Sequence, residues 1–168
     1  MMSDKPTKRQ RLKEHEEPAA YPSDQLKKLA TDILLKHGAD KQVATDTAEA
    51  MTRASLRGVD SHGLGLLPRI LERAAHPDGP RCHLSTPCSV ELDAPAVAVI
   101  DGGLAPGQHS CLVAARLASL KAKQCGVAMV LVKNSTHFGA TAAFLEVLLE
   151  SGLVGVIGSN STPSMAIL

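Results

Sequence analysis

The stretch Ala96-Val97-Ala98-Val99-Ile100-Asp101-Gly102-Gly103 decides the fold class. Its apolar run has the length of a buried strand, and the Asp-Gly-Gly triplet closes that run as a turn. Just before it, Ser89-Val90-Glu91-Leu92-Asp93 alternates polar and apolar residues, which indicates a half-buried strand. The two segments together predict a pair of neighbouring strands.

Helices and further strands are expected to alternate downstream of this pair. The pattern predicts a helix from about residue 108 to 124, a strand over 127–132, a helix over 140–149 and a strand over 153–157. A β-α-β-α-β order is typical of helices packed on a sheet. The sequence therefore predicts an α/β fold, with its sheet domain over 81–168.

Upstream of the strand pair, the spacing of apolar residues becomes helical. Ser23 is expected to cap a first helix that stops at His37-Gly38, and Asp40 a second that ends near Arg57-Gly58. A third helix follows, with Pro68 in its first turn. The second helix is expected to bury one face, made of Val43, Ala44, Thr47, Ala48, Met51 and Ala54. Residues 23–80 thus form an N-terminal helical segment that begins with a helical hairpin.

The composition is that of a globular protein, with 44% hydrophobic and 21% charged residues among 168. A formal net charge of +1 gives no general attraction to nucleic acid, and an aromatic content of 2% leaves few rings to stack on bases. Every apolar stretch is interrupted well short of the roughly 20 residues that cross a membrane. Neither nucleic acid nor a membrane is an expected partner.

The first 22 residues are dense in charge and lack apolar periodicity, so we expect a disordered polar tail over 1–22. The four cysteines contain no Cys-x-x-Cys pair, and no signal peptide precedes them. Free thiols in a reducing compartment, the cytoplasm, are therefore expected. Cys82-His83 with Cys88 does not have the spacing of a zinc site, and no metal is predicted.

The run Gly58-Val59-Asp60-Ser61-His62-Gly63 lies between two predicted helices and supplies the first candidate for chemistry. A histidine has an ordinary pKa of about 6.5, so His62 could hold or release a proton close to neutral pH. The same residue types are also common at helix N-termini, where Asp60 or Ser61 would cap the next helix. From the residues alone, both interpretations stay open.

Two polar loops are expected at the carboxyl ends of strands. The first is Asn134-Ser135-Thr136-His137-Phe138-Gly139, and the second is Gly158-Ser159-Asn160-Ser161-Thr162-Pro163. Ligands of open α/β sheets bind at this edge, and the N-terminus of a following helix favours anionic groups. A well-capped connection is the alternative interpretation of the first loop.

The glycine-rich turn Gly102–Gln108 has Walker-like glycine spacing, but Gln108-His109 stands where a P-loop needs Lys and then Ser or Thr. The turn also lacks the Gly-x-Gly-x-x-Gly dinucleotide motif. We therefore expect a tight turn leading into a helix, whose backbone N–H groups could still meet a ligand.

In their order along the chain, these motifs resemble those of the type-2 malate/L-lactate dehydrogenase family, which includes ureidoglycolate and sulfolactate dehydrogenases. The residues that carry the resemblance are Gly58–Gly63 with Leu67-Pro68-Arg69, Asp101-Gly102 with Gly107-Gln108, Asn134–Ala140 and Ser159-Asn160-Ser161. The resemblance runs from about Ser23 to the C-terminus. It implies NAD- or NADP-dependent hydride transfer on a small 2-hydroxy or 2-oxo acid, in a sheet domain that is not of the Rossmann type.

The resemblance also implies roles for single residues. His62 would be the catalytic acid/base that exchanges a proton with the substrate oxygen, and Ser61 would position it. The cofactor and substrate cleft would be lined by His137, Ser135, Gly139, Asn160 and Ser161. Family members are typically homodimers, so a homo-oligomer is expected.

The sequence departs from the family pattern at two points. Family members usually place an Arg four residues after the catalytic His to pair with the substrate carboxylate, whereas this chain has Leu66 there. An aliphatic side chain cannot replace a bidentate cation, although Arg69 or Arg57 could reach in instead. Family chains are also about twice as long, so the α/β domain over 81–168 is expected to be incomplete.

Two hypotheses about function follow. In the first, the chain is a dehydrogenase subunit, shortened but of clear ancestry. In the second, it is a catalytically inactive fragment that acts as an interaction module and pairs with a full-length homologue through unpaired strand edges. Binding of the nicotinamide cofactor distinguishes the two.

Overall fold

A computed structural model describes residues 20–160 of the chain. Most of the predicted tail over 1–22 lies outside this range, as does Ser161. The helices are α2 (Ser23–Lys36), α3 (Lys41–Leu56), α4 (Leu67–Ala74), α5 (Gly107–Cys125) and α6 (Ala142–Glu150), with short 3-10 turns η1 (Asp60–His62) and η2 (Leu64–Leu66). The strands are β1 (Ser89–Asp93), β2 (Val97–Asp101) and β3 (Met129–Lys133). These elements confirm an α/β fold.

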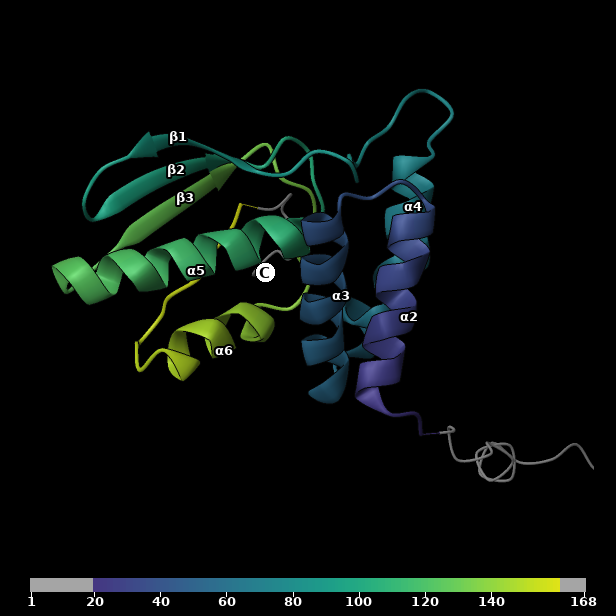
Figure 1. Cartoon of the computed structure of the whole chain (residues 1–168), viewed down its shortest axis with the longest axis horizontal. Coiled ribbons are helices and arrows are strands. Elements are labelled where there is room, and N and C mark those ends of the chain that lie inside the picture. Colours follow the sequence, from purple (N-terminus) through teal and green to yellow (C-terminus); the bar gives the residue numbers. More distant parts are fainter. Residues whose placement is uncertain (1–19, 161–168) are drawn as a thin grey trace, which may run out of the picture.

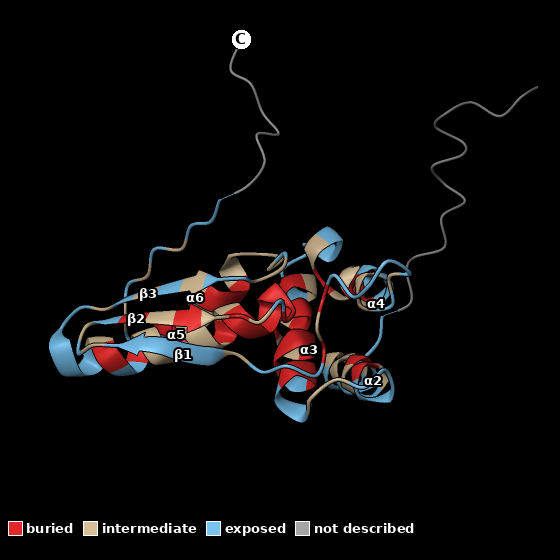
Figure 2. Ribbon diagram, turned by 90° about the horizontal axis from the view of Figure 1, so that it is seen from above, coloured by how far each residue is buried: buried red, intermediate tan, exposed pale blue. Residues whose placement is uncertain are grey.

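The elements gather into two neighbouring groups (Figure 1). Helices α2, α3 and α4 pack together at one end, and the sheet lies at the other end with α5 and α6 on one side of it. Helix α5 runs along one face of the sheet (Figures 1 and 2). The opposite face of the sheet is uncovered among the described residues, and β1 is exposed along its whole length.

The three strands form one mixed sheet in the order β1-β2-β3. Strands β1 and β2 are antiparallel, with Ser89 opposite Asp101 and an irregular register between Val90 and Leu92. Strands β2 and β3 are parallel, so that Asp101 lies opposite Lys133 at their carboxyl ends. The predicted strand pair is confirmed, and the predicted strand over 127–132 is present two residues further on.

The helix boundaries confirm one predicted cap and correct another. The Asp40 side chain accepts hydrogen bonds from the backbone N–H groups of Gln42 and Val43, at 2.7 and 3.3 Å, and so caps α3 as expected. The predicted cap at Ser23 is wrong by one residue. The Pro22 carbonyl oxygen already accepts the first helical hydrogen bond, from Leu26, and Ser23 is therefore the first residue inside the helix.

Helix α3 lies between two apolar cores. One core joins it to α2 and α4 and contains Ala30, Leu34, Ala44, Ala48, Met51, Leu67, Ile70, Cys82 and Leu84. The other joins it to α5 and α6 and contains Ala50, Leu112, Ala115, Ala143, Phe144 and Leu148. The predicted face of α3 is buried throughout, but Asp46, Ala50 and Thr52 on its other side are buried as well. The second core explains this additional burial.

The predicted strand over 153–157 is not present. Leu153 and Ile157 pack against the core formed with α6, while Val154 and Val156 are each 97% exposed. The segment therefore has the alternating burial of a strand without hydrogen bonds to a neighbour in the sheet. Its apolar alternation is satisfied by packing on a helix, and the predicted β-α-β-α-β order ends one strand earlier, as β-α-β-α from β2 to α6.

Candidate active site

The His62 motif is held by close contact with α3 and not by a helix cap. Neither Asp60 nor Ser61 makes a side-chain capping hydrogen bond, so the predicted capping role is wrong. Instead the Ser55 hydroxyl accepts a hydrogen bond from the Leu64 backbone N–H at 3.1 Å. A Cβ at Gly63 would lie 2.1 Å from the Ser55 Oγ, so only glycine allows this approach.

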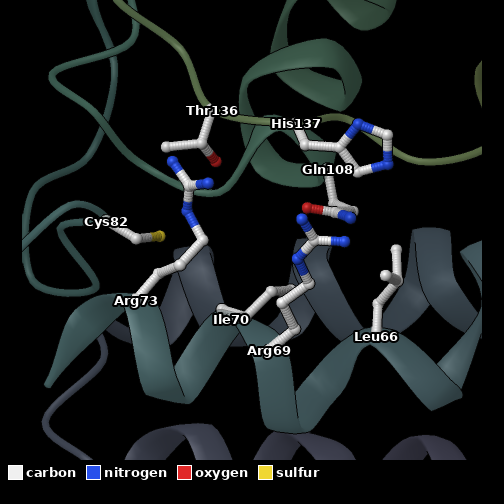
Figure 3. A pocket seen from close by; sticks show the side chains of 8 residues that line it. All are labelled: Leu66, Arg69, Ile70, Arg73, Cys82, Gln108, Thr136 and His137. Carbon is white, nitrogen blue, oxygen red and sulfur yellow. The ribbon is translucent and has the colours of Figure 1, made fainter. Parts of the chain in front are cut away.

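A cavity of about 280 Å³ opens between α4 and the loop that follows β3 (Figure 3). Its walls come from the end of η2, from α4, from the first turn of α5 and from this loop. The lining residues are Leu66, Arg69, Ile70, Arg73, Cys82, Gln108, Thr136 and His137. Ligand pockets have volumes of about 300 to 1,000 Å³, so this cavity is at the lower limit and has room only for a small molecule.

The cavity carries positive charge, and among the described residues no acidic side chain pairs with it. Arg69 and Arg73 lie about one turn apart on α4, and Figure 3 shows both guanidinium groups extending from the helix toward the loop. Within residues 20–160, neither forms an ion pair with an acidic side chain. Arg73 donates one long hydrogen bond, 3.4 Å, to the Arg81 carbonyl oxygen. Two guanidinium groups without a counter-ion favour an anionic ligand such as a carboxylate.

Gln108 brings a neutral polar group to the same cavity. The residue is 1% exposed, and neither its Oε1 nor its Nε2 has a hydrogen-bond partner among the described residues. Figure 3 shows its amide facing the cavity alongside the guanidinium of Arg69. An unpartnered buried polar group costs about 1 to 3 kcal/mol, so a ligand that both accepts and donates a hydrogen bond here would recover that cost.

His62 and His137 meet beside this cavity. Their ring centroids are 5.5 Å apart, although the two residues come from different ends of the fold. The Ser61 Oγ lies 2.9 Å from the Nδ1 of His62. A Cβ at Gly139, where φ is +86°, would lie 3.2 Å from the His62 carbonyl oxygen and 3.3 Å from the Gln108 Nε2. Gly139 therefore keeps the loop close to both residues.

Hydrogen bonds to the glycine-rich turn fix the loop after β3. The Gly107 N–H donates to the Thr136 Oγ1 at 3.1 Å, and that hydroxyl donates to the Ala105 carbonyl oxygen at 3.2 Å. A Cβ at Gly107 would lie 2.4 Å from the Thr136 carbonyl oxygen. The Gly107 N–H is thus used inside the protein.

The surroundings of His137 favour its neutral form. Burial lowers the pKa of His137, and the nearby positive charges of His62, Arg69 and Arg73 lower it further. The imidazole is therefore largely uncharged at neutral pH. It can accept or donate a hydrogen bond at the cavity while the two arginines supply the charge.

Comparison with known proteins identifies the family of this chain. The family model for malate/L-lactate dehydrogenase matches residues 21–168. The chain belongs to this family. It is 34% identical over 141 residues to L-sulfolactate dehydrogenase from Methanocaldococcus jannaschii, a match that covers 83% of this chain and 40% of that protein. It is 31% identical over 145 residues to malate dehydrogenase from Pyrococcus horikoshii, covering 86% of this chain and 39% of that one.

Solved structures of malate dehydrogenases share the fold. The crystal structure of malate dehydrogenase from Entamoeba histolytica matches with a TM-score of 0.73 at 26% identity, covering 80% of this chain and 37% of that one. The malate dehydrogenase structure from Pyrococcus horikoshii matches with a TM-score of 0.72 at 30% identity, covering 80% and 38%. The chain spans about two fifths of the length of these members of the malate/L-lactate dehydrogenase family.

The structure brings some of the predicted site residues together and leaves others apart. Ser61, His62, His137 and Gly139 are neighbours, and among them His137 lines the cavity. The half-buried Ser135 is not part of the cavity wall; its Oγ lies 3.4 Å from the Thr136 carbonyl oxygen. Asn160 is exposed at the end of the described residues, after a segment that is not a strand, and Ser161 lies outside them.

The structure also decides between the two arginines considered as substitutes for the missing cation at Leu66. Arg57 points elsewhere, because its Nε donates to the Glu146 Oε1 at 2.7 Å and holds α3 to α6. Arg69 lines the cavity beside Leu66. Position 69 is therefore the one that reaches the cavity in this member of the malate/L-lactate dehydrogenase family.

Sequence reasoning missed Arg73 as a cavity residue, and it named Thr136 only as part of the candidate loop. The spacing of Leu66, Arg69 and Arg73 by three and four was the available signal, because such residues share one face of a helix. Gln108 was named only as the residue that excludes a P-loop and as part of the family resemblance. Nothing in its local sequence predicts that its amide is buried without a partner.

Two further features of the described residues concern metals and membranes. The structure groups no three His, Cys, Asp or Glu side chains in residues 20–160 so that they could hold a metal ion. None of the helices in that range is long and apolar enough to span a membrane.

Proposed function

We propose that the chain carries the substrate side of an NAD- or NADP-dependent dehydrogenase that interconverts a small 2-hydroxy acid and the corresponding 2-oxo acid. The observation that carries this proposal is the cavity, in which Arg69, Arg73 and the unpartnered amide of Gln108 face the same small volume. Membership of the malate/L-lactate dehydrogenase family supports the reaction class.

The two arginines would bind the carboxylate of the acid. Each guanidinium presents parallel N–H donors that match the two oxygens of a carboxylate. The position at which family members usually carry the carboxylate-binding Arg is Leu66 in this chain. Arg69, three residues later, lines the same cavity. We propose that Arg69 and Arg73 together take over the role of the missing arginine.

His62 would exchange the proton on the oxygen at carbon 2. Its Nδ1 lies 2.9 Å from the Ser61 hydroxyl, which can either donate or accept a hydrogen bond. In the reduction of the oxo acid, the imidazolium form of His62 would give its Nε2 proton to the substrate oxygen. In the oxidation, the neutral ring would keep its proton on Nδ1, so that Nε2 is free to take the hydroxyl proton. Ser61 is thus proposed to accept a hydrogen bond from Nδ1–H in both directions of the reaction.

The loop after β3 lies beside the residue proposed for proton transfer. Gly139 lets this loop approach the His62 carbonyl oxygen and the Gln108 amide closely. We propose that Ser135, His137 and Gly139 hold the cofactor, with Asn160 and Ser161 contributing from the segment beyond α6. The bound nicotinamide would supply the acceptor or donor of hydride at carbon 2.

Two features support a sheet that is not of the Rossmann type. Strand β1 pairs with β2 antiparallel, and the glycine-rich turn lacks the dinucleotide motif. We propose a non-Rossmann domain that begins at about residue 81 and is only partly contained in this chain, with the helical segment over 23–80 supplying His62 and the arginines.

Fluorescence of NADH and NADPH tests the cofactor, and their oxidation in the presence of oxaloacetate, pyruvate or 2-oxoglutarate tests the reaction. His62→Gln is expected to lower kcat by about 100-fold or more while KM changes little, because general acid/base catalysis contributes about 100- to 10,000-fold. Failure of the folded chain to bind either cofactor at millimolar concentration refutes the proposal.

Substitution of the arginines tests the carboxylate site. Arg69→Leu and Arg73→Leu are each expected to raise KM for the oxo acid by about 10- to 100-fold, as expected for loss of a charged hydrogen bond. Arg81→Leu, at an exposed arginine outside the cavity, is the matched control. The substitution Leu66→Arg should increase the affinity for the oxo acid only a little if Arg69 and Arg73 already bind its carboxylate. A tenfold or larger gain would contradict that assignment.

A second candidate function is that of an inactive fragment that pairs with a full-length homologue. The observation that favours it is the apolar surface on the segment after α6, where Val154 and Val156 are almost fully exposed, and on the sheet, where Met129 and Leu131 are about half exposed. A chain that binds no cofactor but forms a defined complex with such a homologue in light scattering would support this function. Light scattering of the chain alone tests the proposed homo-oligomer.

A further inference from the structure

Gln108 is a buried side chain whose amide makes no hydrogen bond within residues 20–160. The residue is 1% exposed, and both its Oε1 and its Nε2 are without a partner in that range. An amide carries an acceptor oxygen and an NH2 group that donates. Most buried polar side-chain atoms in proteins have a partner, so two unused groups on one side chain indicate a place kept for a ligand.

The other polar side chains of the cavity wall leave a distinct task to Gln108. Arg69 and Arg73 are cations and suit the carboxylate of an acid. The Thr136 hydroxyl already accepts one hydrogen bond and donates another within the protein. Gln108 therefore supplies a neutral N–H donor that no group in the described part of the chain uses, and such a donor suits an uncharged oxygen of a ligand.

The Nε2 of Gln108 and the backbone of His62 border the same point. A Cβ at Gly139 would lie 3.2 Å from the His62 carbonyl oxygen and 3.3 Å from the Gln108 Nε2. Figure 3 shows the Gln108 side chain and the guanidinium of Arg69 extending toward one another from α5 and α4. Carbon 2 of an acid is bonded directly to its carboxylate carbon. An acid held at Arg69 would therefore have its oxygen at carbon 2 close to the Gln108 amide.

We propose, on the basis of the function given above, that the Gln108 Nε2 donates a hydrogen bond to the oxygen at carbon 2 of the acid. The same donor serves the carbonyl oxygen of a 2-oxo acid and the hydroxyl oxygen of a 2-hydroxy acid, because each has a lone pair that can accept. The hydroxyl proton is then left for His62. In the reduction, the electron pair of the carbonyl bond moves onto this oxygen, and the N–H donor stabilises the negative charge that develops there.

This role of Gln108 makes the site specific for an oxygen at carbon 2 and not only for a carboxylate. An acid without that oxygen leaves the buried amide unpartnered, which is costly. A site built to hydrogen-bond a substrate oxygen rejects the analogue that lacks it. The expected ligands are therefore 2-oxo and 2-hydroxy acids, and acids of the same length without this oxygen should bind more weakly.

Equilibrium binding of paired acids to the full chain tests the proposal. L-malate and succinate differ only in the hydroxyl at carbon 2, as do L-lactate and propionate. Calorimetric titration gives a Kd for each acid, with and without saturating NADH, which cannot reduce any of the four. In the wild type, the hydroxy acid of at least one pair should bind about tenfold or more tightly than its partner.

Substitution of Gln108 should remove much of this preference. In Gln108→Leu the ratio of the two Kd values should fall by about threefold or more, as for loss of one neutral hydrogen bond. Gln108→Glu keeps the length of the side chain and an acceptor but, ionised beside the arginines, loses the N–H donor, so the ratio should fall equally. A smaller fall in either variant overturns the proposal. If Gln108→Leu does not fold, Gln108→Glu decides.

Three controls separate binding of this oxygen from other effects. Gln124→Leu, the same substitution at an exposed residue near the end of α5, should leave the ratio unchanged. Arg69→Leu should weaken both acids of a pair alike, because both carry the carboxylate. The Gln108 amide has no partner among the described residues, so Gln108→Leu should not lower the melting temperature. A fall of more than about 5 °C would assign the amide a structural role and contradict the proposal.

Failure of this proposal can be told apart from failure of the dehydrogenase function. If the wild type binds both acids of each pair with equal affinity, the role of Gln108 is refuted and the carboxylate site remains. If the wild type binds none of the four acids, the carboxylate site is refuted, and the proposed function fails with it.

Discussion

Raising the pH from 6 to 9 is expected to destabilise the chain through one residue, His109. Its pKa is about 9 in the folded protein, compared with about 6.5 for an exposed histidine in the unfolded chain. A group whose pKa is raised on folding contributes stability that is fully present below pH 6.5 and is lost as the pH rises through 9. Because His109 is almost fully buried, solvent screens this contribution only weakly.

The difference between the two pKa values corresponds to about 3 kcal/mol in the free energy of unfolding. A folded domain has a total stability of about 5 to 15 kcal/mol, so this single residue would account for a large fraction of it. For a chain of this size, the melting temperature should fall by roughly 6 to 12 °C between pH 6 and pH 9. Thermal unfolding followed by circular dichroism measures that change.

The variant His109→Gln isolates the contribution. Its melting temperature should be lower than that of the wild type at pH 6 and should approach it at pH 9. The buried thiol of Cys111, whose pKa is raised to about 12, adds a loss of stability only above about pH 8.5 and affects both proteins alike. If wild type and variant lose the same stability between pH 6 and 8, the reasoning about His109 is wrong.

Three substitutions test local packing and capping by chemical denaturation. Gly63→Ala should lower the free energy of unfolding by about 1 to 3 kcal/mol, because its Cβ would meet the Ser55 Oγ at 2.1 Å; Gly158→Ala, with open space around it, should change little. Asp40→Ala should cost about 1 kcal/mol through loss of the α3 cap, and Asp40→Asn should retain most of that stability. Gly107→Ala should displace the loop after β3 and raise KM for the oxo acid more than it lowers stability, since a Cβ there would lie 2.4 Å from the Thr136 carbonyl oxygen.

Local sequence patterns predicted most of the elements because each pattern is a property of neighbouring residues. The glycine after α2, the Asp40 cap of α3 and the apolar run of β2 each act within a few residues, and the structure places them where the patterns indicate. The burial of Asp46 is different. Its side chain contacts His109 and Arg116 of α5, which follow it by more than 60 residues, and no pattern inside α3 indicates that contact.

The segment over 153–157 shows the limit of periodicity in a β region. Alternating apolar residues require one buried face, and that face can pack on a helix as well as on a sheet. Leu153 and Ile157 satisfy the alternation against α6 without a neighbouring strand. A strand also needs a hydrogen-bonded partner, and the local sequence contains no information about that partner.

In the candidate site too, local motifs predicted some residues, whereas the role of others depends on contacts with distant segments. His62 and His137 were predicted from short motifs, and the structure brings their rings to 5.5 Å. Arg73 and Gln108 were not predicted, because their importance depends on what they face and not on their neighbours. Gln108 follows a glycine turn that excludes a P-loop, yet its burial without a partner is the feature that most clearly indicates a ligand.

The departure at Leu66 has a structural explanation in the register of α4. A cation that binds a carboxylate need not occupy one position, provided that it projects from the same face of the helix into the same cavity. Positions 66, 69 and 73 share that face, and Arg69 and Arg73 have no acidic partner within the described residues. Moving the charge along α4 also places it close to His137, where it helps to lower the pKa of that imidazole. The same two arginines that we propose to bind a carboxylate therefore also favour the neutral form of His137, so that the proposed anion would meet two cations and an uncharged ring.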